Sequence, residues 1–133
     1  MSTPDGVPYS EQKEELSARF AHVLETVNNP LSMEFYVSLM EIGELHARKQ
    51  KDYGVEGDPF ANVRASEDFG IPAWMGAMIR GNDKVSRIKT YAKKKELANE
   101  GVEDSFQDLA TYSLIALVLF REEQAAQAAS EEQ

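Results

Sequence analysis

Hydrophobic residues recur along this chain at intervals of three and four, the spacing that places them on one face of an α-helix. The pattern predicts helices over residues 10–27, 32–50, 58–69, 72–95 and 103–123. The chain carries no clear β-hairpin signal and no internal repeat. It is therefore expected to adopt an all-α fold, a compact bundle of four to five helices.

Residues that start or stop helices support these boundaries. Ser10 and Ser32 are candidate N-caps for the first two helices. Asn28-Asn29-Pro30 is expected to end the first helix, because Pro cannot continue it. Asp58-Pro59 combines a capping residue with Pro at the first helical position, and Phe69-Gly70 is a stop signal.

The last predicted helix, 103–123, is the most apolar, so we expect it to form the core of the bundle. The helix over 72–95 contains Gly76 and Gly81, which weaken its intrinsic helix propensity.

Length and composition indicate one globular domain. The chain has 133 residues, of which 42% are hydrophobic and 28% charged. We expect a single domain over 1–133, with 1–9 and 124–133 as flexible tails, the second of which can also extend the last helix. No apolar run has the length of a membrane span and the N-terminus does not resemble a signal peptide, so we expect a cytoplasmic protein.

Charge and cysteine content exclude several kinds of function. The formal charge of -9 argues against binding to a nucleic-acid backbone. The chain has no Cys, which excludes disulfides, thiolate zinc sites and cysteine nucleophiles. His22 and His46 are not at ligand spacing and no Glu-x-x-His motif is present, which argues against a di-iron bundle.

Two pairs of acidic residues lie within otherwise apolar helices. Glu41 and Glu44 are three residues apart and Asp104 and Asp108 are four apart, so each pair projects from one helix face. If the two faces were opposed, the gathered carboxylates would need a neutralising partner. Oxygen ligands suit Mg²⁺ or Mn²⁺, and Mg²⁺ held by carboxylates commonly binds nucleotide phosphates. We therefore predict a metal site formed by these four residues.

A basic face lies on the predicted helix over 72–95. Arg80, Lys84 and Arg87 follow at spacings of four and three, so they share one side of the helix. Cationic side chains beside a bound metal ion suit a triphosphate, because they bind the oxygens that the metal does not. A solvated charged face that improves solubility explains the same residues without a ligand.

Further candidate binding residues lie between and after these helices. Lys51 is placed to meet a phosphate, Tyr53 to stack on a base, and Asn62 to read a base edge. Trp74 is a second candidate for base stacking. Each has a structural alternative as well, namely a turn at Tyr53, a surface position for Asn62 and core packing for Trp74.

An ordered series of motifs is similar to a known family. The series consists of Arg48-Lys-Gln-Lys-Asp-Tyr-Gly, Asp58-Pro-Phe-Ala-Asn-Val-Arg, Gly70-Ile-Pro-Ala-Trp, Arg80-Gly-Asn-Asp-Lys and Glu103-Asp-Ser-Phe-Gln-Asp-Leu-Ala-Thr-Tyr. Over residues 33–122 the chain resembles phage-encoded, MazG-like nucleotide pyrophosphohydrolases of the all-α NTP pyrophosphatase superfamily, some of which act on dATP or dGTP. The resemblance implies a homodimer or homotetramer that binds Mg²⁺ or Mn²⁺. It also implies hydrolysis of a purine (d)NTP to the monophosphate and pyrophosphate in the host-cell cytoplasm.

The family pattern places a Glu-Glu-x-x-Glu helix opposite a Glu-x-x-Asp helix. Glu41 and Glu44 match the last two acids of the first motif, and Asp108 matches the final acid of the second. The resemblance therefore implies that these three residues are catalytic. Asp104 lies one residue further back than the pattern requires, so Asp104 and Glu103 are alternatives for the fourth ligand.

The expected mechanism is attack of a metal-bound water on the α-phosphorus. Arg80, Lys84 or Lys51 would stabilise the added negative charge. Two non-catalytic alternatives remain, a nucleotide-binding partner of phage DNA synthesis and a helical interaction module. In the latter the acids form structural salt bridges with Arg48, Arg80 or Lys84.

Overall fold

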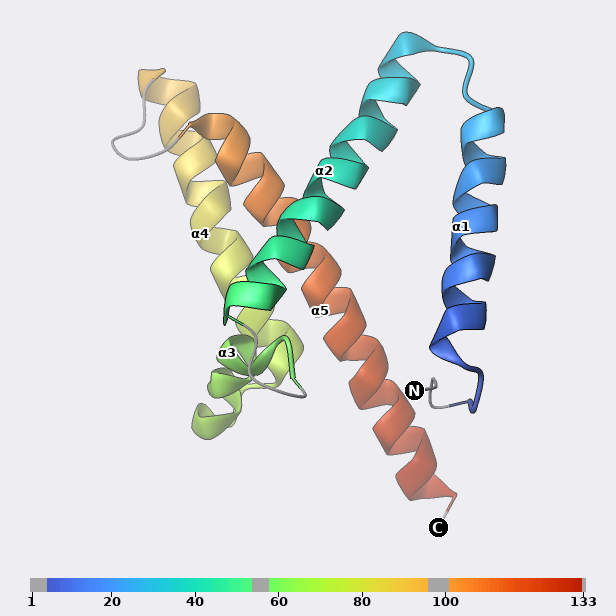
Figure 1. Cartoon of the computed structure of the whole chain (residues 1–133). Coiled ribbons are helices and arrows are strands. Elements are labelled where there is room, and N and C mark those ends of the chain that lie inside the picture. Colours follow the sequence, from blue (N-terminus) through green and yellow to red (C-terminus); the bar gives the residue numbers. More distant parts are fainter. Residues whose placement is uncertain (1–4, 54–57, 96–100, 133) are drawn as a thin grey trace. The chain divides into compact units, whose positions relative to one another are not determined.

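A computed structural model describes residues 5–53, 58–95 and 101–132 of the chain (Figure 1). These residues form helices and no strand, which confirms the predicted all-α fold. In chain order the elements are α1 (Tyr9–Glu25), α2 (Pro30–Tyr53), α3 (Ala61–Arg64), the short 3₁₀ helix η1 (Ala65–Phe69), α4 (Ala73–Lys94) and α5 (Val102–Glu131). In the described ranges, no helix combines the length and the hydrophobicity needed to cross a membrane.

The two predicted N-caps are wrong, and the local sequence explains why. The N-cap of α1 is Pro8, so Ser10 lies within the helix. At the start of α2, Asn29 Oδ1 accepts a hydrogen bond of 2.8 Å from the backbone N–H of Leu31. Asn29 therefore acts as the cap, and the helix begins at Pro30, two residues before Ser32. An Asn cap followed by Pro is a favourable start because Pro has no N–H to leave unpaired.

The predicted helix over 58–69 begins later than expected and is divided into α3 and η1. Asp58 Oδ1 accepts a hydrogen bond of 3.0 Å from the backbone N–H of Phe60, which makes a turn before the first helical residue. The predicted stop is confirmed, because Gly70 ends η1 in the left-handed conformation with φ of 75°.

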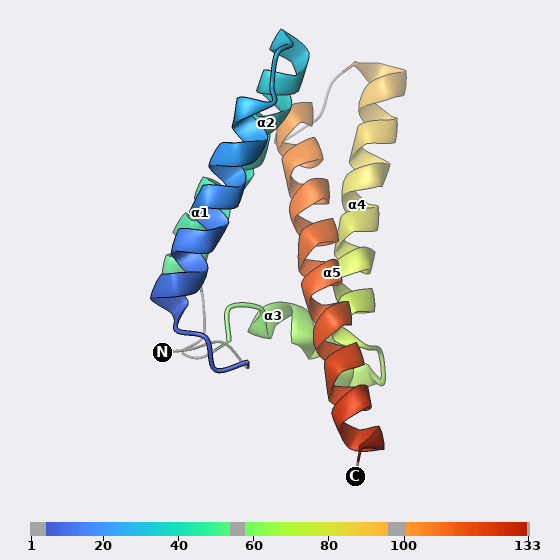
Figure 2. The same ribbon diagram turned by 90° about the vertical axis from the view of Figure 1, so that its right-hand side faces the viewer.

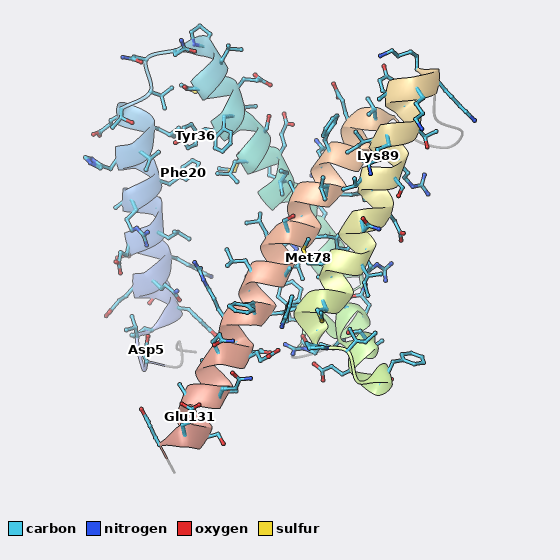
Figure 3. The ribbon with its side chains drawn as sticks, turned by 180° about the vertical axis from the view of Figure 1, so that it is seen from behind. Asp5, Phe20, Tyr36, Met78, Lys89 and Glu131 are labelled. Carbon is cyan, nitrogen blue, oxygen red and sulfur yellow. The ribbon has the colours of Figure 1, made fainter. Side chains whose placement is uncertain are left out.

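The described residues fall into two compact units, one ending at Glu41 and the other beginning at Ile42. The first unit contains α1 and the N-terminal half of α2. The rings of Phe20 and Tyr36 meet edge to face, with centroids 6.1 Å apart, and Figure 3 shows them pointing toward one another. No residue of α1 is buried.

In the second unit α4 and α5 lie side by side, as both Figure 1 and Figure 2 show. The buried core there is small and is formed by Val63, Ala73, Ala77, Ala116 and Leu119. Small side chains dominate it because two helix backbones that approach closely leave little space between them.

The two glycines of α4 lie at such close approaches. A Cβ on Gly76 would lie 2.5 Å from Ser66 Oγ and 3.0 Å from the backbone oxygen of Val63. A Cβ on Gly81 would lie 3.5 Å from Leu109 Cδ1. Both glycines are buried, so their low helix propensity accompanies tight packing.

The last helix is longer than its apolar pattern indicates. It continues to Glu131, through most of the segment 124–133, for which an extension of this helix was one expectation and a flexible tail the other. It buries Ser105, Ala116 and Leu119 on one side. On other sides it leaves Phe106, Leu114 and Val118 about half exposed. Some of its apolar residues therefore lie outside the core of the second unit, on exposed surface.

Candidate functional site

A cavity of about 410 Å³ opens in the second unit, between the C-terminal half of α2, the segment leading into α3, and α5. Part of its wall is apolar and is formed by Leu45, Pro59, Phe60, Val63 and Ile115. The volume falls in the range of about 300–1,000 Å³ that is typical of small-molecule sites.

The rest of the wall carries groups that form hydrogen bonds or bear charge. These are His46, Lys49, Asn62, Asp108, Thr111 and Tyr112. Such a mixture of apolar surface and a few polar groups is typical of a site that orients a ligand.

Asp108 is the centre of the charged part of this wall. Its Oδ2 lies 3.1 Å from Lys84 Nζ, and its Oδ1 lies 3.8 Å from Lys49 Nζ. The side chains of Lys84 and Asp108 are only 17% and 20% exposed, so their attraction is less screened than at an open surface. Asp108 therefore has an ammonium group near each of its two carboxylate oxygens.

Arg80 adds a further cation close to the cavity. Its guanidinium carbon lies 5.8 Å from the centre of the Tyr112 ring, a cation–π contact with a residue of the cavity wall. The three residues of the predicted basic face of α4 therefore have different surroundings. Arg80 and Lys84 contact residues of the cavity wall, whereas Arg87 is exposed further along the helix.

The predicted acidic ligands occupy different places. Asp108 lines the cavity, whereas Asp104 and Glu103 lie exposed in the first turn of α5. Glu44 is exposed on α2, and Glu41 is exposed in the other unit. In the described part of the chain, no group of three or more His, Asp or Glu residues is placed to hold a metal ion. The charge of Asp108 is met by lysine.

The other predicted binding residues are also separated. Asn62 lies on α3 and lines the cavity. Lys51 and Tyr53 belong to the last turn of α2 and not to a loop, because no helix-breaking residue occurs before Gly54. Their side chains lie outside the described part of the structure.

Trp74 packs in the core. It contacts the buried cluster of the second unit, and its ring meets Phe120 edge to face with centroids 5.6 Å apart. Its buried Nε1 has no hydrogen-bond partner among the described residues. The position matches core packing, and Trp74 is not among the residues that line the cavity.

A second, more open cavity of about 550 Å³ lies beside Arg64. The Arg64 guanidinium donates to Asp58 Oδ2 at 2.7 Å and to both Glu122 oxygens at 2.7 and 2.9 Å. The hydrogen bond from Arg64 lowers the pKa of the Glu122 carboxyl below its usual range. The same interactions raise the pKa of Arg64 above its usual range. This network joins the segment before α3 to α5.

His46 and Lys49 line the cavity but were not predicted as binding residues. His46 was weighed only as a metal ligand, and Lys49 appeared only within the motif that begins at Arg48. Their spacing of three was a usable signal, because residues three apart share one face of a helix.

Comparison with known proteins gives one match. The family described as "Nucleotide modification associated domain 1" matches residues 49–120, more than half of the chain. The matched segment contains Lys49, Asn62, Asp108, Thr111 and Tyr112, and so most of the charged and polar cavity wall. No curated protein and no solved structure matches the chain.

Proposed function

Because the chain belongs to the nucleotide modification associated domain 1 family, we propose that it is a nucleoside triphosphate pyrophosphohydrolase. The proposed substrate is a purine nucleotide such as dGTP or dATP, and the products are the monophosphate and pyrophosphate. The observation that carries the proposal is the cavity wall that contains Lys49 and Asp108, with Lys84 in contact with Asp108.

The charges at the cavity suit a phosphate ligand. Lys49 and Lys84 offer ammonium donors to phosphate oxygens, and charge-assisted hydrogen bonds of this kind are strong. Asp108 holds the ammonium group of Lys84 in a partly buried position, so little side-chain entropy is lost when a phosphate binds there.

In the proposed reaction, a water oxygen forms a bond to the α-phosphorus and the bond to the oxygen bridging the α- and β-phosphorus breaks. Pyrophosphate leaves with the bonding electron pair, and the water protons pass to solvent. Lys49 and Lys84 stabilise the negative charge that develops on the phosphate oxygens. The proposed cofactor is Mg²⁺ or Mn²⁺, which lowers the pKa of a bound water. Of the predicted ligands, Asp108 lines the cavity and would hold the ion there.

A nucleotide-binding module without turnover is the second candidate. Pairing of Asp108 with Lys84 and Lys49 favours it, because the carboxylate already has its charge partners. Such a module would bind nucleotides through the lysines and release them unchanged.

A panel of the common NTPs and dNTPs, incubated with Mg²⁺ or Mn²⁺, separates these candidates. We expect a purine deoxynucleotide to yield monophosphate and pyrophosphate, identified by chromatography. Nucleotide binding by calorimetry with no product formed would reject the hydrolase and support the binding module. If the protein neither binds nor hydrolyses any of these nucleotides, both candidates are rejected.

Variants connect any activity to the cavity. Lys84→Ala is expected to lower kcat/KM by about 100-fold, the typical effect of removing a donor to developing charge. Lys89→Ala is the matched control, because Lys89 is exposed on the same helix and is expected to leave activity unchanged (Figure 3). Equal activity of the two variants would show that the reaction does not use this cavity.

A further inference from the structure

His46 and Phe60 form an aromatic wall in the cavity. Their rings are stacked, with centroids 5.8 Å apart and an angle of 28° between the planes, and both residues line the cavity. Phe60 also packs against the buried core of the second unit, which fixes its ring. A rigid aromatic surface is suited to a flat ring, because stacking gains contact area at little entropic cost.

A cation lies next to this aromatic wall. His46 and Lys49 are three residues apart on α2, so their side chains share one helix face, with Cβ atoms about 5–6 Å apart. The wall therefore joins a surface for a flat ring to the ammonium group beside Asp108. A ligand that contacts both is aromatic at one end and anionic at the other.

Hydrogen-bonding groups complete the aromatic part of the cavity. Asn62 has an amide that both donates and accepts, which matches the edge of a nucleobase. Thr111 Oγ1 donates to the backbone oxygen of Gln107 at 2.8 Å, so its remaining capacity toward a ligand is as an acceptor.

We propose that His46 and Phe60 form the nucleobase subsite of this cavity, with Asn62 at the base edge and Lys49 at the phosphate nearest the sugar. This inference rests on the proposed function, which it deepens by assigning the base. It gives His46 the role of a stacking residue.

Calorimetry with two ligands tests the subsite without any hydrolysis. dGMP and 2-deoxyribose 5-phosphate share a sugar and a phosphate and differ in the base. In EDTA-containing buffer, we expect dGMP to bind the unmodified protein at least about tenfold more tightly, the range reported for stacking of one base. Equal affinities, or no binding of either ligand, would overturn the subsite.

Substitutions assign the base contribution to the aromatic wall. His46→Ala is expected to weaken dGMP binding by about tenfold and to change the affinity for 2-deoxyribose 5-phosphate by less than about twofold. His46→Phe keeps a stacking ring and should restore dGMP binding. His22→Ala is the matched control, because His22 is an exposed histidine of α1 that pairs with Glu25. If His46→Ala weakens the binding of both ligands equally, or of neither, the assignment is overturned.

Phe60→Leu provides an independent test that retains an apolar side chain in the core. It should weaken dGMP binding and spare the sugar phosphate, whereas Phe69→Leu, at an 83% exposed position, should change neither. The subsite and the hydrolase fail in different ways. Base-dependent binding without turnover rejects only the hydrolase, and turnover with no dependence on the base rejects only the subsite.

Discussion

Gly76 has no side chain, and its neighbours occupy the space where a methyl group would lie. The closest of these neighbours are Ser66 Oγ and Cβ, followed by the backbone oxygen of Val63. Ser66 is itself held in place, because its hydroxyl donates to the backbone oxygen of Ile71 at 3.1 Å. The residue at position 76 therefore determines how closely α4 approaches α3 and η1.

We predict that Gly76→Ala destabilises the protein although Ala is the better helix former. Overpacking typically costs about 1–3 kcal/mol, which exceeds the gain in helix propensity. Gly43→Ala is the control, since a Cβ there meets nothing within 4 Å, and it should stabilise by about 0.5–1 kcal/mol. Urea denaturation measures both, and equal effects would show that the contact at Gly76 relaxes freely.

Residue chemistry also determined which part of the site could be predicted. Asp108, Lys84 and Asn62 belong to residue types and patterns that suggest binding, and all three contact or line the cavity. The pairing of Lys49 with Asp108 could not be predicted, because it depends on tertiary packing between α2 and α5. The prediction that four acids meet at one metal site depends on tertiary packing in the same way. Helix periodicity shows which face of a helix carries a residue, but not which element packs against that face.

At the scale of the elements, one arginine joins segments that are distant in the sequence. Arg64 on α3 binds Asp58 before the helix and Glu122 on α5. Bidentate pairing of this kind fixes orientation as well as distance. The short α3 is held against α5 although it has few residues of its own to bury.

The pKa shift of Glu122 makes this connection sensitive to acid. Its pKa is lowered in the folded protein, so the stabilisation is present above the unfolded-state pKa and is lost as pH falls through the lower folded-state pKa. We predict that Glu122→Gln narrows the difference in stability between neutral and strongly acidic pH, with a modest effect because the side chain is 57% exposed.

Chemical denaturation at both pH values measures this difference. Glu123→Gln is the control, because its side chain accepts a hydrogen bond from Gln127 rather than from Arg64. An acid dependence that is the same for Glu122→Gln and the unmodified protein would contradict the assignment.

Helix positions followed from the sequence more readily than helix ends. The apolar period identified α1, α2, α4 and α5 because each has several turns over which the pattern repeats. The ends depended on single residues, and Asn29 took the capping role assigned to Ser32. α5 continues to Glu131 through a segment rich in Ala and Glu, which have high helix propensity although they have little to bury.

At the scale of the whole molecule, α5 exposes several large apolar side chains. Leu114, Leu117 and Val118 lie at neighbouring positions on α5 and are 45%, 42% and 49% exposed. Exposed apolar patches commonly mark protein contacts. Oligomer formation is therefore expected to involve α5.

We predict a homodimer or homotetramer in solution, measured by light scattering after size exclusion. Leu114→Glu should lower the measured mass while circular dichroism shows unchanged helix content, because a charge on this surface opposes burial. Ala129→Glu, at an exposed position further along α5, should not change the mass. A monomeric unmodified protein would contradict the prediction.

The lysines at Asp108 have a consequence for which anions can reach the cavity. The whole chain carries a formal charge of -9, so its long-range field repels nucleic acids, whose charge is distributed over many phosphates. The positive charge at Lys49 and Lys84 acts over only about 8 Å at physiological salt. A single nucleotide has few charges to be repelled at long range and can enter this short-range region. On the proposed function, free nucleotides are therefore expected to reach the cavity more readily than the polymers built from them, which a comparison of dGTP with a DNA oligonucleotide as competitors would measure.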